Sequence, residues 1–360
     1  VARAARMAKL SPENPEAMPP LGRQTYRAAP GARDTATAKL GPAPRAQAAG
    51  SAIAAATSAK VTIAGYYEHA IRTRSLATTA GLSAFHAWTG ASMTCTARTP
   101  DGTGSGWAGG AGHRVASFDP AALAKTAVDK AVRSAKPTRL DPGRYTVVLE
   151  PAAVADLLEF LTGSFGARRA DEGRSFFSKP GGGTRVGEKL FPDTITLRSD
   201  PTDPTLEATP FDASGFPLAP TTWIDKGVVT GLAYDRYWAQ KQGKQPTGDP
   251  QGFILDGGKA TREELVKGVK RGVLITRFWY LRWIDPQTIL VTGLTRDGVF
   301  LIENGEVTRS VNNFRFNDSP VQMLANCDAL SASVVSPMGQ MRVPAVRTNN
   351  FNLASISEAV

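Results

Sequence analysis

The pattern of hydrophobic and polar residues divides the chain into stretches of different character. Residues 1–60 are rich in Ala, Pro and Gly, and the Ala-rich run 47–59 favours a helix. Over residues 61–110 polar residues alternate with apolar or aromatic ones, which is the period of antiparallel strands, with turns predicted at 80–81, 89–90 and 100–104. A helix is predicted over 121–134, because Asp119 is a suitable N-cap and Pro120 suits the first helical position.

The second half of the chain has a different pattern. A linker over 136–143 precedes a predicted strand at 145–150 and a helix at 152–161. Thr261 and Glu264 have the spacing of a capping box and predict a further helix start. The run 276–320 reads as consecutive strands, and Asn304-Gly305 predicts a two-residue hairpin turn. The expected strands are 278–284, 289–292, 299–303 and 306–311, with a charged tight turn at 295–298.

These patterns predict an α+β fold with two domains. We expect an N-terminal α/β domain over residues 1–140, with antiparallel strands and flanking helices, and a mostly β C-terminal domain with a few helices over 141–360. The basic, Ala-rich start lacks the apolar stretch of a secretory signal and does not begin with Met, so we expect residues to precede Val1.

Composition narrows the class of protein. Hydrophobic residues make up 42% and charged residues 21% of the chain, which is typical of a globular protein, and no apolar run has the length of a membrane span. Cys95 and Cys327 are far apart, which excludes a Cys-rich zinc site and fits reduced thiols in the cytoplasm. The net charge of +10 raises nucleic acid as a partner. The densest basic clusters, 168–169 and 267–271, contain no interleaved aromatic residues, so nucleic acid is not the expected partner.

Several motifs together resemble one protein family. GTGSGWAG at 102–109 and GRYTVVLEPAAVADLLEFL at 143–161 are followed by TGLTRDG, ENG and NFRF within 292–316. Their order and spacing are similar to those of the TldD/PmbA family, and the resemblance runs from about residue 21 to the C-terminus. It implies a metallopeptidase-related protein of one of two kinds. TldD-like subunits carry His-Glu-x-x-x-His on a helix and a late Cys that together hold zinc, whereas PmbA/TldE-like subunits keep the fold without these residues.

At the positions where the resemblance places the family's metal ligands, this chain has other residues. The slots of the first His, the Glu and the second His fall on Glu159, Phe160 and Ser164, and the region of the late Cys, 333–343, contains no Cys. We therefore expect no catalytic residue, metal or cofactor in this chain, and zinc in a TldD-like partner.

Other residues are candidates for contact with a peptide or a partner. Ser105 resembles the nucleophile of a Gly-x-Ser-x-Gly elbow, but Trp107 stands where the second Gly belongs, so a glycine-rich turn is the better interpretation. The TRDG and NFRFND segments carry a polar cluster that either fixes the hairpin register or lines a central cavity of the assembly. The candidates for binding a peptide or partner are Gly104, Ser105, Asp212, Arg296, Asp297, Arg315 and Asn317.

Three functional hypotheses follow. The favoured one is a non-catalytic PmbA/TldE-like subunit that pairs with a TldD-like zinc metallopeptidase to degrade or process unfolded peptides. The alternative is a standalone homodimeric peptide-binding or scaffold protein without protease activity. A third is an enzyme with relocated chemistry that uses His69, His86 or His113, since strand pairing would bring His69 near His86.

Overall fold

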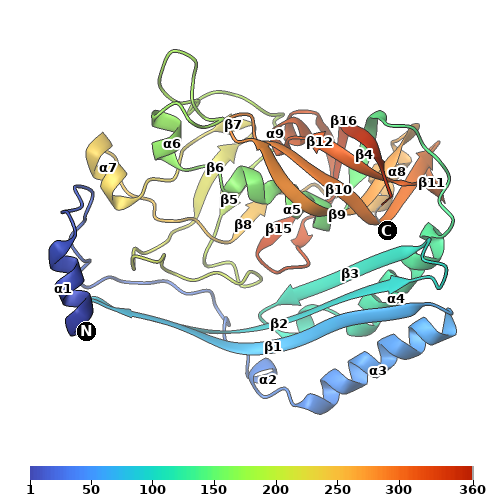
Figure 1. Cartoon of the computed structure of the whole chain (residues 1–360), viewed down its shortest axis with the longest axis horizontal. Coiled ribbons are helices and arrows are strands. Elements are labelled where there is room, and N and C mark those ends of the chain that lie inside the picture. The colour runs from blue at the N-terminus through green and yellow to red at the C-terminus, as the bar shows by residue number, and fades with distance from the viewer. Residues whose placement is uncertain (359–360) are drawn as a thin grey trace.

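The N-terminal part of the chain forms a sheet with helices on one side. A computed structural model describes residues 1–358. The strands β1 (Thr62–Ala77), β2 (Ser83–Arg98) and β3 (Ser105–Gly112) form an antiparallel sheet in that order. The helices α3 (Pro42–Ser58) and α4 (Pro120–Ser134) pack against this sheet, and α4 also contacts the C-terminal part of the chain (Figure 1). The predicted start of α4 is confirmed, because Asp119 Oδ1 accepts a hydrogen bond from the N–H of Ala121.

One turn predicted in this sheet is wrong. β2 continues through Thr89 and Gly90 without interruption. The Thr89 side chain is buried and its hydroxyl donates to the His113 carbonyl at 2.8 Å, which ties the middle of the strand to a neighbouring loop. A Cβ at Gly90 would lie 2.3 Å from Nη1 of Arg72, so the glycine serves a close approach of side chains and not a turn.

The C-terminal part is built around a closed ring of strands. β4 (Gly143–Leu149) pairs in parallel with β9 (Arg271–Asp285), which pairs with β10 (Leu290–Glu303). β12 (Asn313–Asp318) and β16 (Val346–Ser357) continue the ring back to β4 through antiparallel pairings. A ring of five strands leaves an interior that side chains fill. β11 (Glu306–Ser310) and β13 (Cys327–Leu330) add to the edges of β10 and β16.

A second sheet and short helices surround this barrel. Helix α5 (Pro151–Thr162) packs against β9. The second sheet has the order β14 (Val334–Val335), β15 (Met341–Val343), β8 (Phe253–Leu255), β5 (Leu197–Ser199), β6 (Thr221–Asp225) and β7 (Val228–Val229). The remaining helices are α1 (Ala2–Leu10), α2 (Thr35–Ala38), the 3-10 turn η1 (Val115–Ser117), α6 (Ala167–Asp171), α7 (Arg236–Gln242), α8 (Arg262–Lys267) and α9 (Pro320–Ala325).

The Asn-Gly hairpin is confirmed, whereas the charged turn before it is wrong. β10 ends at Glu303 and β11 begins at Glu306, and Asn304 and Gly305 have φ of 51° and 82°, as a type I′ turn requires. The segment 295–298 lies inside β10, where the register against β9 shifts and Asp297 adopts φ of 56°. A bulge absorbs the left-handed residue, so the strand bends and does not reverse.

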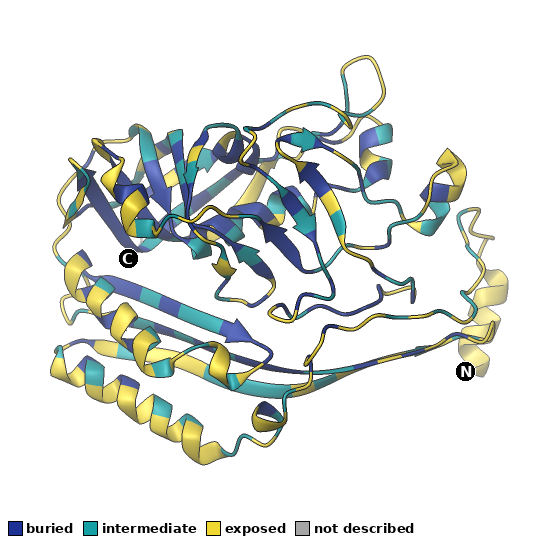
Figure 2. Ribbon diagram, turned by 180° about the vertical axis from the view of Figure 1, so that it is seen from behind, coloured by how far each residue is buried: buried dark blue, intermediate teal, exposed yellow. Residues whose placement is uncertain are grey.

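The fold is α+β, as predicted. The largest hydrophobic core lies in the C-terminal part, between the barrel, α5 and the second sheet, and a smaller Ala-rich core lies between the N-terminal sheet and its helices. Figure 2 shows that much of the C-terminal strand core is buried, whereas β1, α1 and the outer faces of α3 and α4 are exposed or half-buried. Among residues 1–358 no helix has the length and apolar character that crossing a membrane requires.

Candidate functional site

Helix α5 presents an apolar and a polar side. Leu157, Leu158 and Leu161 are fully buried in the main core. Asp156 and Glu159 are three residues apart and therefore lie on one face of the helix. That face lines cavities at the surface, so the helix that carries the family's metal-binding slots borders open space.

The late segment of the chain lies against the polar side of α5. A cavity of about 60 Å³ is lined by Asp156 and Glu159 from α5 and by residues 336–341. Arg277 of β9 and Trp107 of β3 complete its walls. The two segments that the resemblance links to a metal site thus lie side by side, and the N-terminal sheet contributes the opposite wall.

The side chains at the family's metal slots do not fit zinc. The ring of Phe160 packs edge-on against Trp283, with centroids 4.9 Å apart, and has no donor atom. Ser164 is buried just beyond α5, and its hydroxyl donates to the Phe160 carbonyl at 2.7 Å. Of these three slot residues, only Glu159 lines a cavity and offers it a ligand atom. Among residues 1–358 no group of three or more His, Cys, Asp or Glu side chains is placed to hold a metal ion.

The two cysteines are equally unsuited to metal binding. Both are buried, and burial raises the pKa of Cys95 to about 11 and that of Cys327 to about 12. With these pKa values both thiols are protonated at neutral pH as long as no metal is bound, whereas thiolate is the form that binds metals.

A continuous groove runs from the small cavity along α5. The central cavity, of about 500 Å³, shares Glu159 and the segment 340–341 with the small one. It shares residues 162–163 and 249–250 with the largest cavity, of about 830 Å³. The three cavities thus adjoin one another along the polar side of α5, and we call them together the groove.

Carboxylates line the central cavity. Glu159, Glu207 and Asp249 all contribute to its walls, and burial raises the pKa of each. Asp212 nearby raises the pKa of Asp249 further, whereas the Arg72 guanidinium, 3.2 Å from Glu207, opposes the effect of burial there. Removal from water disfavours the charged form of an acid, so the groove is a partly desolvated surface.

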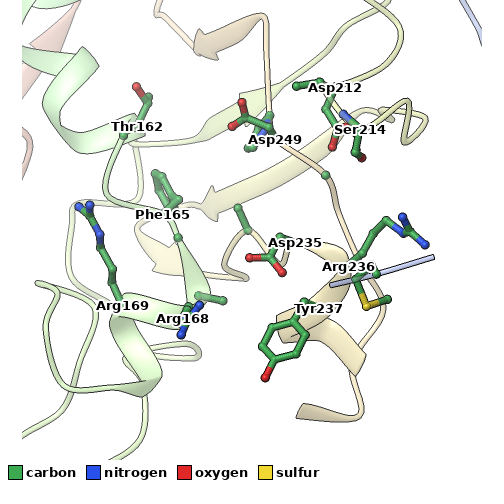
Figure 3. A pocket seen from close by; sticks show the side chains of 18 of the residues that line it. Thr162, Phe165, Arg168, Arg169, Asp212, Ser214, Asp235, Arg236, Tyr237 and Asp249 are labelled. Atoms are coloured by element: carbon green, nitrogen blue, oxygen red, sulfur yellow. Dashed lines mark hydrogen bonds between the residues drawn. The ribbon is translucent and has the colours of Figure 1, made fainter. Parts of the chain in front are cut away.

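The largest cavity contains one residue that the sequence singled out. Asp212 lies on its rim together with Ser214, opposite Arg169, and α7 contributes Tyr237 (Figure 3). Oδ1 of Asp212 accepts hydrogen bonds from the N–H groups of Ser214 and Phe216, at 2.8 and 3.0 Å. This carboxylate therefore fixes its own turn, and the turn forms part of the groove wall.

Ser105 and Asp297, both singled out by the sequence, are in contact. The Ser105 hydroxyl of β3 donates to Oδ1 of Asp297 in β10, and Arg277 lies 3.4 Å from Oδ2. Asp297 is only 3% exposed. Arg277 also stacks over the Trp107 ring at 4.4 Å, so this cluster joins the N-terminal sheet to the barrel. A Cβ at Gly104 would lie 2.3 Å from the Ala131 carbonyl, so Gly104 allows the sheet to pack on α4.

The remaining candidates lie elsewhere on the barrel. Arg296, Arg315 and Asn317 belong to β10 and β12 and do not line any of the cavities that form the groove along α5. The residues predicted to bind a peptide or a partner therefore lie in three places: the groove wall, the junction between the N-terminal sheet and the barrel, and one outer face of the barrel.

The hypothesis that His69 pairs with His86 is wrong. The register places His69 opposite Ala91 and His86 opposite Arg74, so the two histidines lie at different heights of the hairpin. His113 Nδ1 donates to the Thr89 carbonyl at 3.0 Å. The position of the turn between β1 and β2 sets which residues of the two strands lie opposite each other. The strand pattern in the sequence does not fix that position closely enough to decide whether the two histidines meet.

Three residues of the site were missed by sequence reasoning. Asp156, Trp107 and Arg277 line the small cavity, and burial raises the pKa of Asp156 to about 6. The Phe278 N–H donates to Asp156 Oδ2 at 3.2 Å. A signal for Arg277 was available, because the run 277–283 (RFWYLRW) combines two arginines with four aromatic residues.

Comparison with known domains defines the class of protein. Residues 142–355 match the PmbA/TldA metallopeptidase C-terminal domain, and residues 32–135 match the PmbA/TldA metallopeptidase central domain. The matched domains are thus those of a metallopeptidase-related protein. The chain belongs to the TldD/PmbA family.

Individual relatives are distant. A protein named metalloprotease from Methanothermobacter thermautotrophicus is 25% identical over 229 residues, which cover 58% of this chain and 48% of that protein. An uncharacterised protein from Methanocaldococcus jannaschii is 30% identical over 134 residues, 37% of this chain and 31% of that protein. The chain thus matches about half or less of the length of these curated relatives.

Two solved structures share the fold. TldE from Thermococcus kodakarensis superposes with a TM-score of 0.86 and 22% identity, over 98% of this chain and 83% of that one. A putative modulator of a DNA gyrase from Thermotoga maritima superposes with a TM-score of 0.82 and 21% identity, over 92% of this chain and 79% of that one. At this level of identity the likeness establishes the fold alone.

Proposed function

We propose that this chain is a peptide-binding subunit without its own zinc site, which acts together with a TldD-like subunit that holds the metal. The observation that carries the proposal is the groove along α5. It borders the helix on which the resemblance places the zinc slots. Glu159 lines the groove, whereas Phe160 packs on Trp283 and the Ser164 hydroxyl bonds back to the helix. A chain that keeps the groove and lacks the ligands retains binding and loses hydrolysis.

The groove suits an extended polypeptide. Its walls include the end of α5, where Gly163 is exposed and has no side chain to cover the main chain. An extended peptide binds such a wall through main-chain hydrogen bonds, which do not depend on its sequence. A folded protein presents few free main-chain groups, so we expect unfolded polypeptides to be the substrates of the assembly.

The first experiment measures metal content and peptide cleavage of the purified chain, alone and mixed with the TldD-like subunit of the same organism. Fluorescein-labelled casein serves as the unfolded polypeptide. We expect the chain alone to be free of stoichiometric zinc and inactive, and the mixture to cleave. Stoichiometric zinc and cleavage by the chain alone would overturn the proposal. Casein binding by the chain alone, with no change on adding the second subunit, would favour the standalone binding protein.

A groove-filling substitution tests where the polypeptide binds. Thr162 lines both the central and the largest cavity, so Thr162→Trp is expected to narrow the passage between them and to weaken casein binding about tenfold. Thr126→Trp is the matched control. Thr126 is also a helical threonine whose hydroxyl bonds to a preceding carbonyl, but it lies on the exposed side of α4. Equal binding by both variants would place the peptide site outside this groove.

A further inference from the structure

Strand register gathers several side chains on one outer face of the barrel. Residues directly opposite each other in antiparallel strands share a face of the sheet. Trp279 of β9 lies opposite Leu294 of β10, which lies opposite Arg315 of β12. In the same way Arg282 lies opposite Thr292, which lies opposite Asn317. We call this surface the arginine–aromatic face and define it by Trp279, Tyr280, Arg282, Arg296, Arg315 and Asn317.

A bulge in β9 adds a second exposed aromatic ring to this face. Between Trp279 and Arg282 the register shifts, and Tyr280 adopts φ of 59°, which is rare for a bulky residue. Trp279 and Tyr280 are 43% and 61% exposed. Strain and exposure of large rings at one position cost stability in the isolated chain, and such features concentrate at functional surfaces.

The arginines hold these rings in place. Arg296 lies over the Trp279 ring at 4.9 Å, and Arg277 approaches the same ring at 5.6 Å. Arg282 lies over the Tyr280 ring at 4.2 Å and also donates to its hydroxyl. Such stacking restricts the rotamers of long side chains before any partner arrives, which lowers the entropy cost of binding.

The face is positively charged and contains no compensating acid. Within residues 1–358 neither Arg282 nor Arg315 lies within ion-pair distance of a carboxylate, and Arg315 donates instead to the Thr292 hydroxyl at 3.2 Å. Asp297 is nearby in sequence, but it is buried and already bonded to Ser105 and Arg277. The guanidinium groups of Arg282 and Arg315 are therefore available to carboxylates on another molecule.

We propose that the arginine–aromatic face is the docking surface for an acidic face of the TldD-like subunit. This inference rests on the proposed function. Trp, Tyr and Arg are the residue types that dominate the binding energy of protein interfaces. Charge complementarity then selects the partner, because a patch of arginines without acids steers carboxylate-bearing surfaces toward it and repels basic ones.

Two other occupants fit the face less well. In a symmetric dimer the face would meet its own copy, which would place arginines against arginines without any carboxylate between them. Single-stranded nucleic acid binds by stacking bases on open aromatic rings. Here guanidinium groups already lie over the rings of Trp279 and Tyr280. A protein surface with carboxylates requires neither like-charge contact nor free ring faces.

The test compares two double charge reversals in the full chain. Arg282→Glu with Arg315→Glu reverses the face, and Lys259→Glu with Lys270→Glu makes the same change in net charge at exposed positions outside it. Affinity for the TldD-like subunit is measured by surface plasmon resonance at 50 and 300 mM salt. We expect the first variant to bind at least tenfold more weakly at low salt and the control to bind within twofold of the unmodified chain. The affinity of the unmodified chain should fall more steeply with salt than that of the first variant.

The outcomes separate this inference from the proposed function. If the unmodified chain forms no complex with the TldD-like subunit, the proposed function fails. If the complex forms and both variants bind equally well, the docking surface lies elsewhere and the proposed function stands. Sedimentation of the unmodified chain as a dimer that the first variant disrupts would assign the face to self-association. Tight binding of a fluorescent dT20 oligonucleotide that the first variant abolishes would assign it to nucleic acid. Either of these last results would overturn the inference.

Discussion

The buried carboxylate of Asp297 provides the sharpest test of how the two parts of the molecule are held together. It accepts a hydrogen bond from Ser105 of the N-terminal sheet and pairs with Arg277 of the barrel. Asp297→Asn keeps the volume, and asparagine tolerates the left-handed backbone at this position, so the substitution isolates the charge. A variant that also strained the backbone would not separate the effect of the charge from the effect of the strain.

The expected loss in the free energy of unfolding depends on which buried polar groups each substitution leaves without a partner. Asp297→Ala leaves the largely buried Arg277 without its partner, and breaking a buried pair in this way costs about 3–5 kcal/mol. Asp297→Asn still accepts a hydrogen bond from Ser105 but loses the charged interaction, which is worth about 1.5–3 kcal/mol. Ser105→Ala removes one hydrogen bond and leaves the ion pair, so we expect about 1–2 kcal/mol.

The assay is the free energy of unfolding from urea denaturation, followed by both tryptophan fluorescence and circular dichroism. Asp141→Asn is the control, since this side chain is 78% exposed and its loss is expected to change stability by less than about 0.5 kcal/mol. The predicted order of destabilisation is Asp297→Ala, then Asp297→Asn, then Ser105→Ala. If Asp297→Asn unfolds like the control, or if Ser105→Ala costs more than Asp297→Ala, then the cluster does not join the two parts as described.

Three further substitutions test other features of the structure. The pKa of Asp156 is raised to about 6, so the folded state binds its proton more tightly than the unfolded chain and stability falls as the pH rises from about 4 to about 6. The stability of Asp156→Asn relative to the unmodified chain should therefore increase by about 2–3 kcal/mol across that window in urea titrations, and parallel pH curves would contradict this account. Gly104→Ala should lower the free energy of unfolding by about 1–3 kcal/mol without affecting casein binding, because its Cβ would lie 2.3 Å from the Ala131 carbonyl. Reduced casein binding at unchanged stability would instead make Gly104 a residue that contacts the peptide. Gly305→Ala should cost more than about 1 kcal/mol in the same assay, since φ is 82° and the Cβ would lie 2.9 Å from the Lys267 carbonyl, and a neutral effect would argue against the type I′ hairpin.

The candidate site was predictable in parts but not as a whole. The resemblance drew attention to α5 and the segment 333–343, and it predicted that the metal slots have changed. The sequence also singled out Ser105 and Asp297, without indicating that they touch each other. It missed Arg277, because a strand residue acquires its partners from neighbours that are distant in the sequence. The groove itself has walls from segments that are spread along the chain from Met18 to Met341, and no local pattern describes such a surface.

The sequence by itself determined the local elements. The Asp119-Pro120 helix start, the Thr261–Glu264 capping box and the Asn304-Gly305 hairpin all appear where they were predicted. Each depends on hydrogen bonds or backbone angles within a few residues, so the necessary information is contiguous in the chain. The wrong turn at Thr89 shows the limit of this reasoning, because a buried hydroxyl bonded to a distant carbonyl overrides the local preference.

Only the tertiary structure decided which distant residues meet. The closure of the barrel depends on pairing β4 with β9, more than a hundred residues later, and the arginine–aromatic face depends on the register of β9, β10 and β12. A shift of one residue in any of these strands would turn Arg282 or Arg315 to the opposite side of the sheet. Register is fixed by the burial of the whole core and not by the exposed residues themselves, so a surface built from exposed side chains can be recognised only after the core has set their positions.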